Sequence, residues 1–497
     1  MHRRLALLGL FVTAITTSAC SSTAQQGAMP NPAASEIKAI EAPSSLETFD
    51  PQQATEGATS GDAASMTSVP SASGETASAA ESAFVAAAPP TPAAASAGAR
   101  KAATFGPGVT DHVIRLGIPY LPPKETYYDI YPELKRPDFK RVWNVVIDAI
   151  NSTGGVLGRQ IEPVFLGPDP TTEETCTYFT EDQEVIAVAG YGMETGPCLD
   201  AAGIVSITHS YVVSPDYYRD APHSLVPLGI SQTRAAELYI NGLMQQGFFD
   251  GHPTIGLIRW DTPEVEDAAV NVVEPMLARH GLEIATEVVL SWPDQKYETE
   301  ATAMAQGRAG VRTFKDAGVD RVLTLDVGSY ILPEFTDYAQ DQDYHPRYGV
   351  DSLNGGEWDT NRSQLKGAVG VGWMPWVDLE PEDAYRYGSE GGRRCKDLLD
   401  AAGEGAQMDT YNEAVWSSSI CDAALLLKAS VEAGGPSITN NSVVAGAESL
   451  RESFQGANTL LTRFGPGRHE GIAAIRFVKW FTGCQCFRYT SELFDAG

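Results

Sequence analysis

The sequence predicts an α/β protein with two lobes, each built on a doubly wound parallel sheet. From residue 106 onward, short apolar runs alternate with helical patterns, which is typical of parallel strands covered by helices on both faces. The alternating series then occurs a second time. Residues 106–497 together also exceed what one hydrophobic core usually holds.

The first series opens with a strand-like run at 113–119 and a helix from Asp138 to Asn151. Apolar residues of this helix recur at i, i+3, i+4 and i+7, so they form one stripe along it. Pro137 suits its first turn, and Gly154 and Gly155 end it. The series continues with strands at 161–166, 185–189 and 205–208 and a helix at 233–246.

The second series repeats this alternation and the chain then returns. It comprises strands at 254–260, 283–291, 321–326 and 347–351 and helices at 264–280 and 299–316. We expect residues 368–376 to cross back to the first lobe, 388–433 to be helical, and 471–489 to form a hairpin. The predicted domains are lobe 1 at 106–232 and 371–470, lobe 2 at 233–370, and a closing C-terminal hairpin at 471–497.

The N-terminus has the features of an export signal. Residues 1–20 combine a basic start with an apolar run from Leu5 to Ile15 that is too short for a permanent membrane span. Their end, Thr17-Ser18-Ala19-Cys20, resembles the bacterial lipobox, in which Cys20 becomes the lipidated first residue; an ordinary signal peptide is the alternative. Residues 21–105 have too few large apolar side chains to fold, so we expect a disordered tether rich in Ala, Ser, Thr and Pro.

Two motifs carry a family resemblance. Residues Asn151 to Ile161 read Asn-x-x-Gly-Gly-Val-x-Gly-Arg-x-Ile, and Gly465 to Gly471 read Gly-Pro-Gly-Arg-His-Glu-Gly ahead of the closing hairpin. Both resemble type I periplasmic-type solute-binding proteins of the leucine/isoleucine/valine-binding branch. The resemblance implies the type I periplasmic-binding-protein fold, in which crossover strands join two lobes around a ligand cleft. The segment 167–184 is shorter than the family's second helix, which predicts a remodelled wall in lobe 1.

The cysteines suit an oxidising compartment, because an even number remains after Cys20 is set aside. Their positions in the proposed fold favour two bridges inside lobe 1, Cys176 with Cys198 and Cys395 with Cys421. Cys484 and Cys486 are the remaining pair, and a bridge between them would need a bulge in the strand. The alternative is a Cys-x-Cys metal site, which lacks further ligands because His469 is the only histidine nearby in sequence.

The charge balance argues against two classes of partner. The whole chain carries a net charge of -29, of which about -26 lies on residues 106–497. So acidic a body makes nucleic acid and anionic lipid surfaces improbable partners. We therefore expect contact with the membrane only through the lipid anchor.

The sequence lacks the usual enzyme signatures. It has no Gly-x-Ser-x-Gly elbow, no phosphate loop and no His-Glu-x-x-His. The loop Gly190 to Gly196 only loosely resembles a dinucleotide fingerprint, and Glu194 would stand where a pyrophosphate must sit. Ser389, in Gly-Ser-Glu-Gly, lacks the spacing of a hydrolase nucleophile. We therefore expect no enzyme activity, no cofactor and no metal.

Ligands of doubly wound sheets bind outside the carboxyl ends of the strands, so the candidate site residues lie in the loops that follow the strands. The resemblance implies that first-lobe loops hold a ligand carboxylate and that acids or tyrosines of the second lobe hold an ammonium group. The alternatives are core packing for the aromatic residues and helix capping for the acids. The candidates are Tyr120, Tyr191, Thr195, His209, Ser210 and Tyr211 in lobe 1 and Trp260, Asp326, Tyr330 and Asp351 in lobe 2.

These expectations combine into one function. The sequence predicts a monomeric, lipid-anchored extracytoplasmic protein that captures a small polar solute, most simply an amino acid, and presents it to the permease of an ABC importer. A ligand-sensing module of the same fold and an exported hydrolase are the alternatives. A sensing module would have a different protein partner from an importer subunit, and a hydrolase would act on ester substrates.

Overall fold

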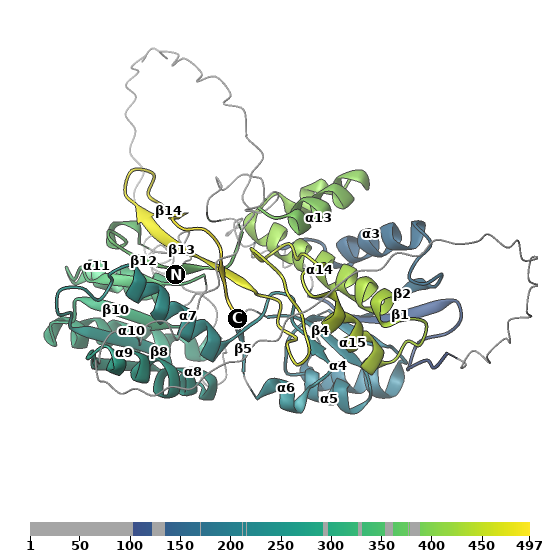
Figure 1. The fold of residues 1–497 in the computed structure, drawn as a ribbon, viewed down its shortest axis with the longest axis horizontal. Coiled ribbons are helices and arrows are strands. Elements are labelled where there is room, and N and C mark those ends of the chain that lie inside the picture. The colour runs from purple at the N-terminus through teal and green to yellow at the C-terminus, as the bar shows by residue number, and fades with distance from the viewer. Residues whose placement is uncertain are drawn as a thin grey trace, which may run out of the picture.

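The computed structural model describes residues 103–121, 135–168, 170–210, 212–214, 216–291, 297–326, 331–352, 361–375, 377 and 388–497. Two lobes lie side by side along the long axis of the molecule (Figure 1). The first lobe holds the helices and strands near the start of the folded body together with α13, α14 and α15. The second holds the middle of the chain and the C-terminal strands. The predicted two-lobed, doubly wound fold is confirmed.

The first sheet has the strand order β2-β1-β3-β4-β6, and its pairs are parallel. The order reverses direction between β1 and β3, which makes that edge a topological switch point where ligands of such sheets bind. The strands are β1 (Val113–Pro119), β2 (Gln160–Leu166), β3 (Ala187–Tyr191), β4 (Val205–His209) and β6 (Ser224–Leu225).

The second sheet has the order β14-β13-β12-β11-β10-β8-β9, with β15 paired to β13. Strands β8 to β12 pair in parallel, and their order reverses between β8 and β10, which makes a second switch point. The strands are β8 (Ile255–Trp260), β9 (Ile284–Leu290), β10 (Arg321–Leu325), β11 (Arg347–Val350), β12 (Val369–Gly372), β13 (Ala474–Phe481), β14 (Cys486–Tyr489) and β15 (Phe494–Asp495).

Helices cover both sheets, and β5 (Val212–Val213) pairs with β7 (Ile230–Ser231) outside them. The first lobe has α3 (Phe139–Ser152), α4 (Thr172–Thr177), η3 (Tyr178–Asp182), α5 (Gly196–Ala201), α6 (Tyr217–Asp220), α13 (Glu390–Ala401), η6 (Gly405–Met408), α14 (Tyr411–Gly434) and α15 (Asn440–Leu450). The second has α7 (Gln232–Gln245), α8 (Pro263–Ala268), η4 (Ala269–Val273), α9 (Glu274–Arg279), α10 (Tyr297–Asp316), α11 (Ile331–Asp341) and η5 (Arg362–Gln364).

The turn between α3 and β2 explains its unusual sequence. Gly155 has φ +71°, and a Cβ there would lie 1.9 Å from the carbonyl oxygen of Arg159, so only glycine fits. The Asn151 side chain donates to the Ile161 carbonyl at 2.9 Å and accepts from the Ile161 amide at 2.8 Å. Asn151 thus ties the end of the helix to the strand that follows.

Helix α14 forms the centre of lobe 1. It begins with a capping box between Thr410 and Glu413 and packs against α3, α13 and α15. Within the described residues, 412–434 is the one helix long and apolar enough to cross a membrane, but 72% of its most apolar stretch is buried inside the protein. This burial identifies it as the core helix of the lobe.

The chain passes between the lobes three times: from β6 to α7, from β12 to α13, and from α15 to β13. The first and third passages run together, because the Val226 amide donates to the His469 carbonyl at 2.8 Å and the Gly471 amide donates to the Val226 carbonyl at 2.9 Å. The Leu460 amide reaches the start of the second passage, because it donates to the Trp373 carbonyl at 2.9 Å. The three passages therefore form one hydrogen-bonded hinge.

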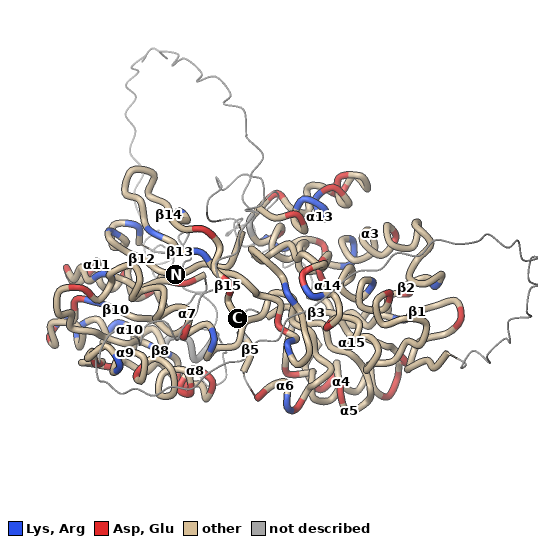
Figure 2. The backbone as a smooth tube through the Cα atoms, in the orientation of Figure 1, with Lys and Arg blue, Asp and Glu red and all other residues tan. Residues whose placement is uncertain are grey.

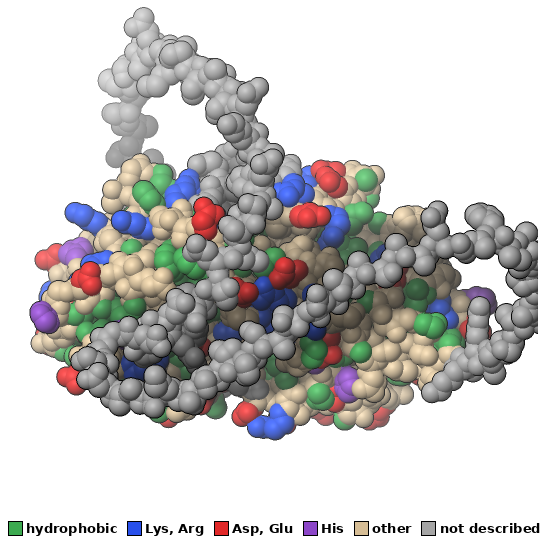
Figure 3. Space-filling model, in the orientation of Figure 1, with side chains coloured by type: hydrophobic (Ala, Val, Ile, Leu, Met, Phe, Trp, Pro, Cys, Tyr) green, Lys and Arg blue, Asp and Glu red, His purple; other side chains and the backbone are tan. Residues whose placement is uncertain are grey.

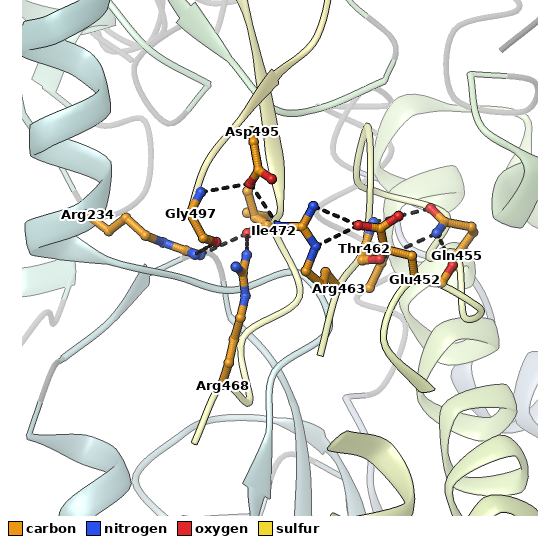
Figure 4. A network of polar contacts seen from close by, with 9 residues as sticks. All are labelled: Arg234, Glu452, Gln455, Thr462, Arg463, Arg468, Ile472, Asp495 and Gly497. Atoms are coloured by element: carbon orange, nitrogen blue, oxygen red, sulfur yellow. Dashed lines mark hydrogen bonds and ion pairs between the residues drawn. The ribbon is translucent and has the colours of Figure 1, made fainter. Parts of the chain in front are cut away.

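Charged side chains brace this hinge in what we call the hinge network, shown in part in Figure 4. Arg463 contacts Asp495 at 2.8 Å and Glu452 at 2.6 Å. Arg234, on α7, donates to the Ile472 carbonyl at 2.8 Å and pairs with Glu470 at 3.0 Å. The hinge network comprises Arg234, Glu452, Arg463, Arg468, Glu470 and Asp495.

The described part of the chain holds three disulfides, two of them in the predicted pairs. Cys176 on α4 is bonded to Cys198 on α5, and Cys395 on α13 is bonded to Cys421 on α14. The third joins Cys484 to Cys486. Cys484 lies in the turn before β14 rather than on a strand, and Gln485 has φ +52°, so the local backbone departs from the regular strand.

Some boundaries differ from those expected. Residues 369–372, expected to cross between lobes, are β12 of the second sheet, and the crossing follows them. The closing hairpin extends that same sheet (Figure 1). Phe105, the last residue of the predicted tether, bridges to Ile438 and belongs to the folded body. The short segment 167–184 forms α4 and η3. The signal peptide, Cys20 and most of the tether lie outside the described residues.

The surface is mixed in character. Acidic and basic residues are interspersed over both lobes (Figure 2), and on the face in Figure 3 hydrophobic side chains are spread in small groups. The largest exposed hydrophobic residues lie on separate elements: Leu157, Val270, Val289 and Phe481.

Candidate functional site

A pocket opens at the switch point of the first sheet. It encloses about 540 Å³, including space open to solvent. The carboxyl ends of β1, β3 and β4 form its floor, and α3 and α14 form its walls. The lining is mostly apolar and comprises Pro119, Leu121, Phe139, Trp143, Gly190, Ile207, Thr208, His209, Pro227, Trp416, Ser419, Ile420, Asp422 and Ala423.

Gly190 sets the depth of this floor. A Cβ on Gly190 would lie 2.8 Å from Cγ of Pro119 on the neighbouring strand. A larger residue would therefore push β1 and β3 apart at the switch point. Gly190, within β3, therefore permits the close approach of the two strands.

His209 is the predicted site residue that reaches the pocket. Its ring stacks on Trp416, with centroids 4.6 Å apart, and its Nδ1 lies 2.5 Å from Ser419 Oγ. Ser419 Oγ donates to the Val415 carbonyl and accepts from Asn458 Nδ2, so His209 Nδ1 is the donor in their contact. Burial lowers the pKa of His209 to about 4. The imidazole is therefore neutral at physiological pH.

Asp422 brings a buried carboxyl group to the pocket from the middle of α14. Burial raises the pKa of Asp422 to about 7, against the opposing effect of the Ala457 amide, which donates to both carboxyl oxygens at 2.9 Å. The carboxyl group also holds the loop that leads into the third hinge passage. It links the pocket wall to the hinge.

At the second switch point, two predicted site residues contact each other. The Trp260 indole donates to Asp326 Oδ1 at 2.9 Å, and the Ile331 amide donates to Oδ2 at 2.7 Å. Asp326 is 1% exposed, and its bond from the amide of Ile331, the first residue of α11, is that of a buried helix cap. This observation favours the capping alternative, and a ligand role for Asp326 stays a prediction.

Asp351 is also buried, at the carboxyl end of β11. Burial and the nearby Asp351 carboxylate both raise the pKa of the Tyr239 hydroxyl. Tyr239 lies on α7, which packs against β12. Asp351 therefore faces at least one core residue of lobe 2, and its contact with a ligand stays a prediction.

Three further candidates that the structure describes lie around the first sheet and are not among the residues lining the pocket: Tyr120, Thr195 and Ser210. Tyr120 packs edge-on against Phe165, with Lys140 Nζ 5.2 Å from its ring. Thr195 is buried at the start of α5, and Ser210 follows His209 directly. The backbone of Tyr191 ends β3, but its side chain lies outside what the structure describes, as do Tyr211 and Tyr330.

Sequence reasoning missed the helix residues of the pocket. Phe139 and Trp143 belong to the apolar stripe of α3, and Trp416, Ser419 and Asp422 come from α14. In the sequence these read as core positions of helices. One signal was available: Asp422 interrupts the apolar run 420–427 of this helix, and a buried carboxyl group needs a reason.

Two alternatives for chemistry find no support among the described residues. The Ser389 hydroxyl caps α13, accepting from the Gly392 amide at 2.9 Å and donating to the Ala457 carbonyl at 2.7 Å. No group of three or more His, Cys, Asp or Glu residues in the described part of the chain could hold a metal ion. Cys484 and Cys486 are bonded to each other instead.

Asp326→Asn should lower the free energy of unfolding by about 1 to 2 kcal/mol and leave solute affinity unchanged. The asparagine side chain keeps one acceptor oxygen and replaces the other with an NH2 group. Either the Trp260 indole or the Ile331 amide would therefore lose its acceptor while buried. Urea denaturation and calorimetric titration of the same variant check both quantities. A tenfold loss of affinity for a cationic solute at unchanged stability would instead assign Asp326 to the ligand.

The sequence matches no protein-family profile and no curated protein, but its fold matches solved structures. A fatty acid ABC transporter substrate-binding protein from Thermomonospora curvata has 15% identity and a TM-score of 0.52 over 79% of this chain and 95% of that one. A branched chain amino acid ABC transporter protein from Thermus thermophilus with bound valine has 15% identity and a TM-score of 0.54, covering 78% and 97%.

A third similar structure is an ABC transporter solute binding protein from R. palustris in complex with 4-hydroxybenzoate, with 13% identity and a TM-score of 0.53 over 78% of this chain and 98% of that one. Each match spans nearly the whole of the known protein and most of this chain. At such low identity they establish architecture. The chain has the two-lobed fold of type I periplasmic solute-binding proteins of ABC transporters.

Proposed function

We propose that this protein is an extracytoplasmic solute-binding protein, anchored to the bacterial membrane by a lipid on Cys20, that captures a small solute between its lobes for the permease of an ABC importer. The observation that carries the proposal is the pocket at the switch point of the first sheet, where proteins of this architecture bind ligands. The similar structures come from binding proteins with an amino acid, an aromatic acid or a fatty acid in their printed descriptions.

The mechanism is capture without chemistry. A solute in the first-lobe pocket would contact the facing edge of the second lobe when the lobes close, and only contacts absent from the open form can favour closure. The three passages hydrogen-bonded together provide the axis for such a motion. A permease would recognise the closed monomer.

A thermal-shift screen of the purified full chain tests the proposal. Amino acids, aromatic and aliphatic acids, amides, polyamines, sugars and nucleosides form the library. A cognate solute should raise Tm in a concentration-dependent way, because it binds the folded state alone. If no solute of any class raises Tm while the chain is folded, capture of small solutes is wrong.

Cys20→Ala tests the anchor separately. Without the thiol that receives the lipid, the protein should leave the membrane fraction or accumulate as unprocessed precursor. Fractionation and mass measurement of the N-terminus check this, with Cys484→Ser/Cys486→Ser as a control that replaces two cysteines elsewhere. Normal processing and membrane retention in Cys20→Ala would refute the lipoprotein assignment.

A further inference from the structure

We propose that the solute is an apolar carboxylic acid without an ammonium group, held with its apolar body in the first-lobe pocket and its carboxylate near Arg136. This inference rests on the proposed function and names the class of solute. It departs from the amino-acid-like solute that the sequence predicted.

The pocket walls fit an apolar body. Its walls carry Phe139 and Trp143 of α3 and Trp416 and Ile420 of α14, and Ile207 lies on the floor. The rings of Phe139 and Trp416 are in contact, with centroids 5.5 Å apart. A lining with several aromatic rings favours a solute whose body is a flat ring or a short branched chain, because such a body displaces water from apolar surface. His209 adds a neutral ring stacked on Trp416. A highly polar solute such as a sugar would leave most of its hydroxyl groups unsatisfied here.

Arg136 supplies the charge for the head group. Arg136 is a half-buried residue, and its guanidinium carbon lies 5.7 Å from the ring centroid of Trp416, a wall residue. Lys135 is already paired with Glu413, and Arg141 with Glu404. Lys140 lies over the rings of Tyr120 and Phe165 instead. Arg136 has no acid partner among the described residues. A guanidinium binds a carboxylate through two parallel hydrogen bonds, so Arg136 is suited to a ligand carboxylate.

Three acids that could hold an ammonium group are engaged within the protein: Asp326, Asp422 and Glu413. Both oxygens of Asp326 accept bonds from Trp260 and Ile331, and both oxygens of Asp422 accept the Ala457 amide. Glu413 is paired with Lys135. An ammonium group in the pocket would therefore lose its hydration without gaining an ionised partner of its own.

Three matched probes separate the classes: phenylacetate, its neutral amide phenylacetamide, and L-phenylalanine, which adds an ammonium group to an aromatic acid. Binding is followed on the full chain by calorimetry and by the fluorescence of Trp143 and Trp416. We expect phenylacetate to bind at least tenfold more tightly than the other two. Tighter binding of L-phenylalanine, or no binding of any probe, would overturn the proposal.

Arg136→Gln tests the head group. Phenylacetate affinity should fall at least tenfold, to the level of phenylacetamide, whereas phenylacetamide affinity should not change. Arg141→Gln is the matched control, because Arg141 lies nearby but is paired with Glu404, and it should bind phenylacetate normally. If Arg136→Gln changes the affinities for phenylacetate and phenylacetamide equally, or changes neither, the proposed role of Arg136 is wrong. An unchanged Tm of the unliganded variant shows that it is folded.

The two proposals fail separately. If a different solute raises Tm in the wider screen and phenylacetate does not bind, the solute class is wrong and capture stands. If no solute raises Tm, the proposed function fails as well.

Discussion

Asp422→Asn should stabilise the protein by about 4 kcal/mol at pH 8 and have little effect at pH 4. Burial raises the pKa of Asp422 to about 7, compared with 3.8 for the ordinary group that the unfolded chain exposes. At pH values between 3.8 and about 7, the Asp422 carboxyl group therefore keeps its proton in the folded state and loses it in the unfolded state. A difference of one in pKa between the folded and unfolded states changes the free energy of unfolding by about 1.4 kcal/mol, which gives the expected size of the effect.

The sign follows from the raised pKa. The stabilising contribution of protonated Asp422 is fully present below pH 4 and is lost as pH rises through 7. Asparagine stays neutral and keeps an oxygen for the Ala457 amide, so the variant should lose this pH dependence. Urea denaturation at pH 5, 6, 7 and 8 measures it, with the exposed Asp397→Asn on α13 as a control. Parallel curves for wild type and Asp422→Asn would show that the carboxyl group ionises freely.

Arg234→Met should lower the free energy of unfolding by about 3 kcal/mol. Arg234 and Glu470 form an ion pair at 3.0 Å, with 17% and 12% of their side chains exposed. Removing one partner leaves a buried charge uncompensated, which costs about 3 to 5 kcal/mol, and Arg468 near Glu470 keeps the loss at the lower end.

The double variant Arg234→Met/Glu470→Gln provides the control, because it removes both charges. It should recover most of the lost stability. Guanidinium denaturation of wild type, both single variants and the double variant forms a complete cycle. Additive effects of the two single changes would mean that the pair does not interact, and the hinge network would then rest on Arg463 alone.

Much of the fold could be predicted from the sequence, because local patterns determine it. The apolar stripe of α3 and the glycines after it mark a helix, a turn and a parallel strand without reference to distant residues. The disulfide pairs within lobe 1 followed once the order of elements was known. The membership of the last strands could not be predicted, since a hairpin such as β13–β14 satisfies its own hydrogen bonds and its sequence does not say which sheet it joins.

The site was harder to predict. Strand ends pointed to His209, Trp260 and Asp326, and all three do stand at switch points. Whether a buried acid caps a helix or holds a ligand depends on partners such as the Ile331 amide, which only the folded chain supplies. The pocket walls were not predicted, because Trp143 and Trp416 occupy ordinary core positions on their own helices. They line one pocket only once α3 and α14, which are distant in the sequence, pack together.

The position of Asp422 in α14 has a consequence for biogenesis. A chain that is exported as proposed passes unfolded through a translocation channel whose side opens to lipid. The apolar segment 412–434 is long enough to leave the channel there and stop in the bilayer. Asp422 lies near its midpoint, where an aspartate opposes insertion by about 2.5 to 3.5 kcal/mol. The carboxyl group that weakens the folded state at high pH thus helps the whole second half of lobe 1 to reach the far side of the membrane.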